Sequence, residues 1–177
     1  MTFRDFENST RPTVGDFYRL NHRYQTLDFA RAKKAEFASL SRGRSGIWEV
    51  CERLNTLIDD SDPDTELSQL EHLLQTAEAA RRDSQPDWLV VTGLVHDLGK
   101  ILALWGEAQW AVVGDTFPLG CPFDKRIVGS EFFEDNPDTS VERFQHGTGI
   151  YEAATGLHNV TMSWGHDEYM YMVAKPY

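Results

Sequence analysis

A histidine stands directly before an aspartate twice in this chain of 177 residues, in "GLVHDLGK" (93–100) and in "GHDE" (165–168). In the first stretch, His96 and Asp97 interrupt an apolar run that is typical of a protein core. A buried carboxylate without a cation is unfavourable by several kcal/mol, so the pattern favours a metal site. A hydrogen-bonded pair in the core stays open as the alternative.

The other histidines divide into three groups. His72 and His166 lie on further predicted helices, and for both the local pattern leaves a metal ligand and a satisfied core histidine evenly open. Imidazole and carboxylate are suitable donors for iron, manganese or zinc. His22 falls among aromatic and basic helical residues and is predicted to be structural, while His146 and His158 are predicted on loops or the surface.

The first half of the chain must supply the helices that position these groups. Thr13 is expected to cap a helix that runs to Phe37, and Ser45 to cap a second one. A third helix is predicted after the acidic turn "DDSDPD" (59–64). Its expected apolar face consists of Leu67, Leu70, Leu74 and Ala77.

A fourth helix is predicted from Pro86, which suits a first helical turn, through the "HD" pair. Its expected apolar stripe is Val91, Leu94, Val95 and Leu98, and His96 and Asp97 would lie about 100° apart around its axis. Beyond Gly106, residues 109–140 have little helical periodicity, which predicts a long ordered loop with one short strand. Helices are expected again over 140–155 and 165–174, so the predicted fold is all-α.

Composition limits the classes of function. The apolar share of 41% and the aromatic share of 12% indicate a folded globule, and the net charge of −11 disfavours nucleic acid as a partner. The opening residues do not resemble a secretory signal, and the longest apolar run, 88–95, is too short to span a membrane. The well-separated Cys51 and Cys121 are expected to be reduced thiols, and the protein to be cytoplasmic.

Longer motifs point to one family. They are "HRYQTLDFA", "LIDDSDPD", "QTAEAAR", "GLVHDLGK", "WAVVGDTFPLGC", "DNPD" and "MSWGHDEYMY". Together they cover nearly the whole chain, which resembles the myo-inositol oxygenases, di-iron enzymes of the HD-domain superfamily. The resemblance implies an HD-domain-like helical bundle with a long ordered loop between its middle and late helices.

The resemblance also implies an activity and cofactors. Enzymes of this family use O2 to cleave the ring of myo-inositol and give D-glucuronate, at a mixed-valent pair of non-haem iron ions, Fe(II)/Fe(III). By this likeness His72, His96 and Asp97 match ligands of the first iron, with Asp97 bridging, and His166 matches a ligand of the second.

Further matches concern the substrate, a neutral polyol that must be held by hydrogen bonds. Lys100 matches a basic residue at the substrate, which suits the stabilisation of a negative oxygen. On composition alone "DDSDPD" would be a solvated turn and Lys100 an ordinary lysine at a helix end. The remaining matches to substrate contacts are Arg4, Asp59, Asp60, Ser61, Gly114 and Asp115.

The family pattern extends beyond Tyr177, where it supplies one more histidine and one more aspartate ligand. We therefore expect residues 1–177 to form a single catalytic domain that lacks its C-terminal segment. The alternatives are a shortened variant that dimerises, an HD-type metal-dependent phosphohydrolase, and a metal-poor fragment without catalytic activity. The expected partner is myo-inositol, with no nucleic acid or membrane, and the expected state is a monomer or weak homo-oligomer.

Overall fold

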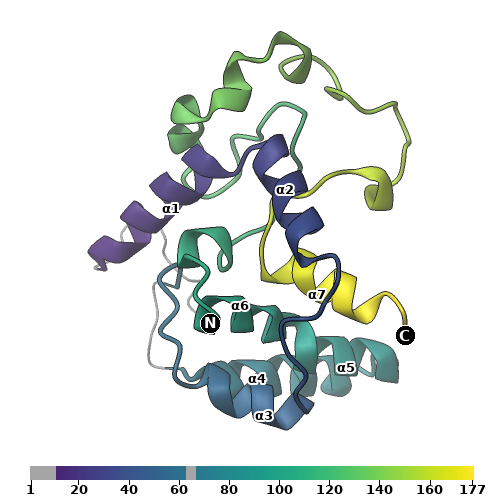
Figure 1. Cartoon of the computed structure of the whole chain (residues 1–177). Coiled ribbons are helices and arrows are strands. Elements are labelled where there is room, and N and C mark those ends of the chain that lie inside the picture. Colours follow the sequence, from purple (N-terminus) through teal and green to yellow (C-terminus); the bar gives the residue numbers. More distant parts are fainter. Residues whose placement is uncertain (1–10, 63–66) are drawn as a thin grey trace.

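A computed structural model describes residues 11–62 and 67–177 of the chain. Within them the regular secondary structure is almost entirely helical, as Figure 1 shows, which confirms the all-α prediction. The α-helices are α1 (Pro12–Tyr24), α2 (Leu27–Phe37), α3 (Ile47–Leu54), α4 (Gln69–Arg82), α5 (Asp87–Val95), α6 (Ile101–Leu104) and α7 (His166–Ala174). The short 3₁₀ turns are η1 (His96–Lys100), η2 (Gln109–Ala111), η3 (Ser130–Asp135), η4 (Pro137–Ser140), η5 (Glu142–Phe144) and η6 (Leu157–Asn159). None of the described helices is long and apolar enough to cross a membrane.

The long first helix predicted from the sequence is wrong, because it is broken into α1 and α2. Helix α1 begins at Pro12 rather than after a Thr13 cap. The break falls at Gln25 and Thr26, and the Thr26 hydroxyl accepts a hydrogen bond from the Phe29 amide to cap α2. The buried side chain of Gln25 bonds to the backbone of Trp164, so a contact 139 residues away fixes this corner.

The next helices occur as predicted, with different details. Helix α3 follows Gly46, without a side-chain cap from Ser45. Ser68 and Glu71 form a reciprocal capping box at the start of α4, which fixes this helix end beside the site. On α4 the buried leucine is Leu73, whereas the predicted core residue Leu74 is exposed.

The "HD" pair lies on a 3₁₀ turn rather than on the α-helix predicted for it. Helix α5 ends at Val95 and tightens into η1 before α6 continues. With three residues per turn, successive side chains are about 120° apart and residues three apart are aligned. Asp97 and Lys100 therefore project from the same side of η1. Val91, expected in the apolar stripe, is exposed on α5.

The late part of the chain corrects two predictions. Residues 140–155 contain short 3₁₀ turns, and no α-helix. Glycines with positive φ at 147 and 149 explain why helical periodicity does not continue there. The short strand expected within 109–140 is, in the described residues, only an isolated bridge between Pro118 and Met162. The segment from η3 to η6 makes the wide excursion at the top of Figure 1 and returns as α7.

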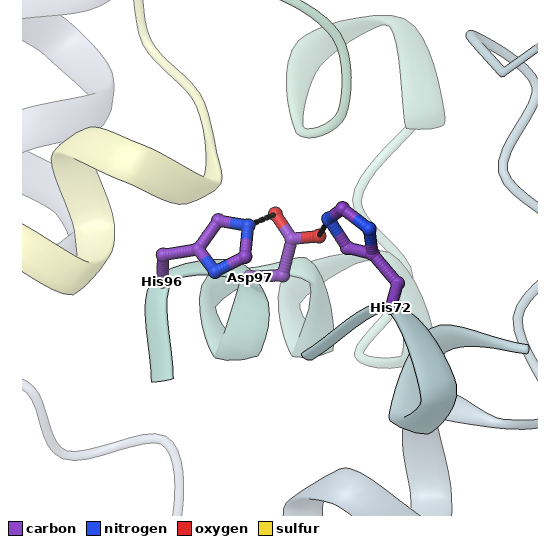
Figure 2. A group of neighbouring side chains, drawn as sticks. All are labelled: His72, His96 and Asp97. Atoms are coloured by element: carbon purple, nitrogen blue, oxygen red, sulfur yellow. Dashed lines mark ion pairs between the residues drawn. The ribbon is translucent and has the colours of Figure 1, made fainter. Parts of the chain in front are cut away.

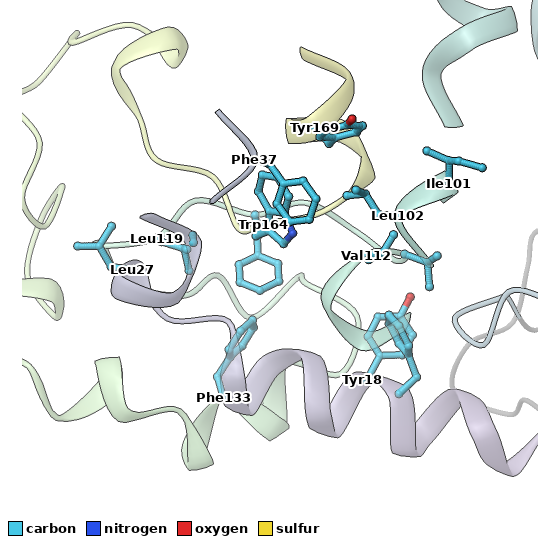
Figure 3. Packing of buried hydrophobic residues seen from close by; sticks show 14 of the residues in the cluster. Tyr18, Leu27, Phe37, Ile101, Leu102, Val112, Leu119, Phe133, Trp164 and Tyr169 are labelled. Atoms are coloured by element: carbon cyan, nitrogen blue, oxygen red, sulfur yellow. The ribbon is translucent and has the colours of Figure 1, made fainter. Parts of the chain in front are cut away.

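Two apolar clusters hold these elements together. The larger joins α1, α2, α6 and α7 with the loop after η2, and Figure 3 shows Phe37, Trp164 and Tyr169 packed at its centre. The smaller consists of Cys51, Leu54, Leu73 and Leu98, from α3, α4 and η1. Turn η1 therefore lies where α3, α4, α6 and α7 meet, and its polar side chains are fixed from several sides.

Candidate metal centre

The carboxylate of Asp97 is the centre of a group of imidazoles that come from three elements. Its Oδ2 is 3.4 Å from His72 Nε2 of α4, and its Oδ1 is 3.5 Å from His96 Nε2 and 3.1 Å from His166 Nε2 of α7. Figure 2 shows His96 and His72 on opposite sides of this carboxylate. Donor atoms of His72, His96 and Asp97 lie within 4.8 Å of one another, close enough to share one metal ion.

The hydrogen bonds behind two of the rings set their chemistry. His96 Nδ1 lies 2.9 Å from the Gly93 carbonyl oxygen, and His166 Nδ1 lies 2.8 Å from that of Val112. A carbonyl oxygen only accepts, so each Nδ1 donates, and in the neutral ring Nε2 keeps its lone pair. These lone pairs face carboxylate oxygens, an arrangement that a cation between them makes favourable. The donor set therefore fits a metal that prefers nitrogen and oxygen.

Burial alone would raise the pKa of Asp97, but the hydrogen bond with His166 and the charge of Lys100 hold it well below its ordinary range. For His166, burial alone would lower the pKa, and the bond to Asp97 together with the charge of Asp167 raises it. In the absence of a metal, a proton on His166 thus compensates part of the negative charge at Asp97. The electrostatic environment of the site therefore favours the binding of a cation.

Lys100 contacts the same oxygen of Asp97 that faces His72. Its ammonium is 2.8 Å from Asp59 Oδ2 and 3.0 Å from Asp97 Oδ2, and it donates to Gln69 Oε1 at 3.2 Å. Burial alone would lower the pKa of Lys100, but the charges of Asp97 and Asp59 raise it. The group is therefore a fixed cation between two carboxylates.

Asp59 belongs to a tight turn that follows α3. Its Oδ1 accepts from the Ser61 amide at 2.9 Å and from the Ser61 hydroxyl at 2.6 Å. Burial alone would raise the pKa of Asp59, and the charge of Lys100 with the bonds from Ser61 lowers it. The turn thus presents Oδ2 of a charged carboxylate to Lys100.

These groups line a pocket of about 160 Å³. Gly114, with φ +84°, forms part of its wall, where a Cβ atom would lie 2.7 Å from the Phe17 ring. Beside it Asp115 is solvent-accessible, although partial burial and the charge of Asp167 raise its pKa. The residues that line the pocket are Tyr18, Asp59, Ser61, Asp62, Leu67, Gln69, His72, Asp97, Lys100, Gly114, Asp115 and His166.

Most candidate residues from the sequence are thus brought together, with some differences. Asp60 is half-buried and is not among the residues that line the pocket, where Asp62 is found instead. His96 contacts Asp97 but is not among the residues that line the pocket. Arg4 lies outside the described residues.

Sequence reasoning missed Gln69 and the carbonyl of Val112. Gln69 precedes His72 by three residues on the same helix, and this spacing is a signal that it shares a face with His72. The Val112 carbonyl accepts from both the amide and the ring of His166, and a backbone acceptor leaves no mark in a sequence.

The remaining histidines lie where the sequence placed them. His22 is fully buried, stacks on Phe133 and lies 2.7 Å from the Val128 carbonyl oxygen through Nε2. His146 and His158 are exposed.

Comparison with known proteins gives a consistent result. Residues 11–176 match the family model described as myo-inositol oxygenase. The chain is 54% identical to inositol oxygenase 1 of Arabidopsis thaliana over 98% of its own length and 58% of that relative. It is 50% identical to the inositol oxygenase of Dictyostelium discoideum, over 97% of this chain and 61% of the relative. For the rat enzyme the identity is 48%, over 89% of this chain and 56% of the relative. The chain thus spans between half and two thirds of the length of these curated relatives.

Proposed function

Because the chain belongs to the myo-inositol oxygenase family, we propose that it takes part in the oxidative ring cleavage of myo-inositol by O2 to D-glucuronate. The observation that best supports this proposal is the convergence of His72, His96 and His166 on the two oxygens of Asp97. The pocket beside them, with carboxylates and one ammonium, suits a neutral ligand with many hydroxyl groups.

We propose that His72, His96 and Asp97 hold one iron ion and that His166 with Asp97 holds a second. Asp97 presents Oδ2 to His72 and Oδ1 to both His96 and His166, so each of its two oxygens faces imidazole nitrogen and could reach a metal ion. When bound, iron supplies redox chemistry with O2 and acidifies a hydroxyl that coordinates it. The carbonyls of Gly93 and Val112 keep the Nε2 atoms of His96 and His166 aimed at the site.

The protein's own groups are proposed to hold and orient the polyol. Lys100 presents a cation three residues along η1 from Asp97, where it stabilises negative charge on a ligand oxygen. The carboxylates of Asp59 and Asp115 accept hydrogen bonds from hydroxyl groups. Ser61 fixes the orientation of Asp59, and Gly114 leaves room at the pocket wall.

A phosphohydrolase is the less favoured candidate, because its substrate is an anion. Among the described residues that line the pocket, Lys100 is the one lysine or arginine, against four aspartates. Such a lining repels phosphate unless metals compensate it.

The single-domain organisation, the cytoplasmic location and the monomeric or weakly oligomeric state stay predictions, as do the roles of Asp60 and Arg4.

The proposal is tested by loading the protein with iron and supplying myo-inositol and O2. D-Glucuronate is expected, with loss of product in Asp97→Asn and no loss in His158→Gln, which changes an exposed histidine away from the site. Stoichiometric iron and bound inositol without any glucuronate would contradict the proposed reaction. Iron-free protein that cannot be loaded would instead support the metal-poor alternative.

A further inference from the structure

The Lys100 ammonium is already surrounded by acceptors within the protein. An ammonium has three N–H donors, and the structure offers three acceptors: Asp59 Oδ2 at 2.8 Å, Asp97 Oδ2 at 3.0 Å and Gln69 Oε1 at 3.2 Å. Lys100 is only 8% exposed, so its position is fixed by these partners. A ligand hydroxyl can therefore bond to Lys100 only if one of the three is released.

Of the three acceptors, Gln69 is the weakest. The two aspartates are charged, and charge-assisted hydrogen bonds are about twice as strong as neutral ones. Gln69 is neutral, and its distance to Lys100 is the longest of the three. Release of either aspartate would also leave a buried carboxylate without its cation, which is far more unfavourable than release of an amide.

The surroundings of Gln69 allow such a release. Gln69 is the first residue of α4 and lines the pocket together with Lys100. Within residues 11–62 and 67–177, its bond to Lys100 is the one polar contact of its side chain. Gln69 is itself only 8% exposed, but its amide is held by this single bond and lines the pocket, so it can turn within the pocket when a ligand takes its place.

We propose that Gln69 is the exchangeable partner of Lys100, so that binding of a polyol replaces the bond from Lys100 to Gln69 by a bond from Lys100 to a ligand hydroxyl. In the free protein Gln69 keeps the third N–H of Lys100 satisfied, and the strength of its hold sets part of the affinity for the ligand. This inference rests on the proposed function, because it takes a polyol as the ligand.

Two variants with side chains of nearly the same shape distinguish displacement of Gln69 by the ligand from a purely structural role of Gln69. Gln69→Met removes the acceptor, so the third N–H of Lys100 is open to the ligand, and affinity for myo-inositol is expected to rise by about two- to tenfold. Gln69→Glu places a charged acceptor on Lys100 that is harder to displace, and affinity is expected to fall by about tenfold. The sign of the change should thus differ between the two variants.

A control variant addresses the position of Gln69 at a helix end. Ser68→Ala breaks the capping box of α4 without touching Lys100. If a disturbed helix end weakened binding, Ser68→Ala would weaken it too, whereas exchange at Lys100 predicts unchanged affinity in this variant.

The experiment is calorimetric titration of myo-inositol into the iron-loaded protein and the three variants, with iron content measured for each. Affinities in the order Gln69→Met, wild type, Gln69→Glu support the exchange. Equal weakening in both Gln69 variants, or no change in either, would overturn it. Binding in the expected order without glucuronate formation would contradict the proposed reaction alone, and wild-type protein that does not bind myo-inositol would overturn both.

Discussion

Gly99 lies directly against the carbonyl oxygen of His166: a Cβ atom on Gly99 would be 2.1 Å from that oxygen. Real Cβ atoms do not come so close to backbone, so only glycine permits this contact between η1 and α7. The contact brings the His166 ring to within 3.1 Å of Asp97. The absence of a side chain at one position therefore determines how the site is assembled.

The first prediction is that Gly99→Ala separates α7 from η1. We expect a loss of about 1–3 kcal/mol in the free energy of unfolding, as for other overpacked positions. Metal affinity should fall as well, because His166 moves away from Asp97. Denaturant unfolding and metal titration measure the two effects. Gly15→Ala is the matched control, since a Cβ on this α1 residue meets nothing within 4 Å and should stabilise the protein by up to about 1 kcal/mol.

The second prediction concerns linkage between metal binding and folding. Fe(II) at about 100 times its dissociation constant should raise the free energy of unfolding by about 2.7 kcal/mol. A chelator should reverse the gain, and His72→Ala should remove most of it because a ligand is lost. His146→Ala changes an exposed histidine and should keep the whole effect. Thermal unfolding under anaerobic conditions provides the measurement, and equal stabilisation of the two variants would argue against a metal at this place.

The site shows which parts of the structure could be predicted from the sequence. A polar cluster at "GLVHDLGK" could be predicted because titratable side chains in an apolar run need compensating partners nearby. The structure places His72, His166 and Lys100 beside Asp97. The single helix predicted to run to Phe37 was wrong because Gln25 bonds to Trp164, a tertiary contact that local periodicity does not record. Gln69 was missed for the same reason, because its importance depends on Lys100, 31 residues later and on another element.

The third prediction is that Lys100→Met is strongly destabilising in metal-free protein. Loss of the ammonium leaves Asp59 and Asp97 buried without their shared cation, which should cost about 3–5 kcal/mol. Adding Asp59→Asn to this variant should restore part of the loss, because one of the two uncompensated charges is removed. Lys34→Met is the control: its partially exposed pair with Glu168 should contribute at most about 1 kcal/mol. A loss no larger than the control's would mean that the two carboxylates are compensated by other groups.

The fourth prediction is that the Asp59–Lys100 pair makes the metal-free protein sensitive to acid. The pKa of Asp59 is lowered from its ordinary value of 3.8, so below about pH 4 the unfolded chain binds a proton that the folded protein still excludes. The stability from this pair is therefore present above the ordinary pKa and is lost as the pH falls through the folded pKa. The slope from this one group is at most about 1.4 kcal/mol per pH unit. Asp59→Asn should flatten this acid limb in urea unfolding measured from pH 5 downward, whereas Asp83→Asn, which changes an exposed carboxylate at the end of α4, should leave it unchanged. Curves of the same steepness for wild type and Asp59→Asn would show that other carboxylates dominate the acid response.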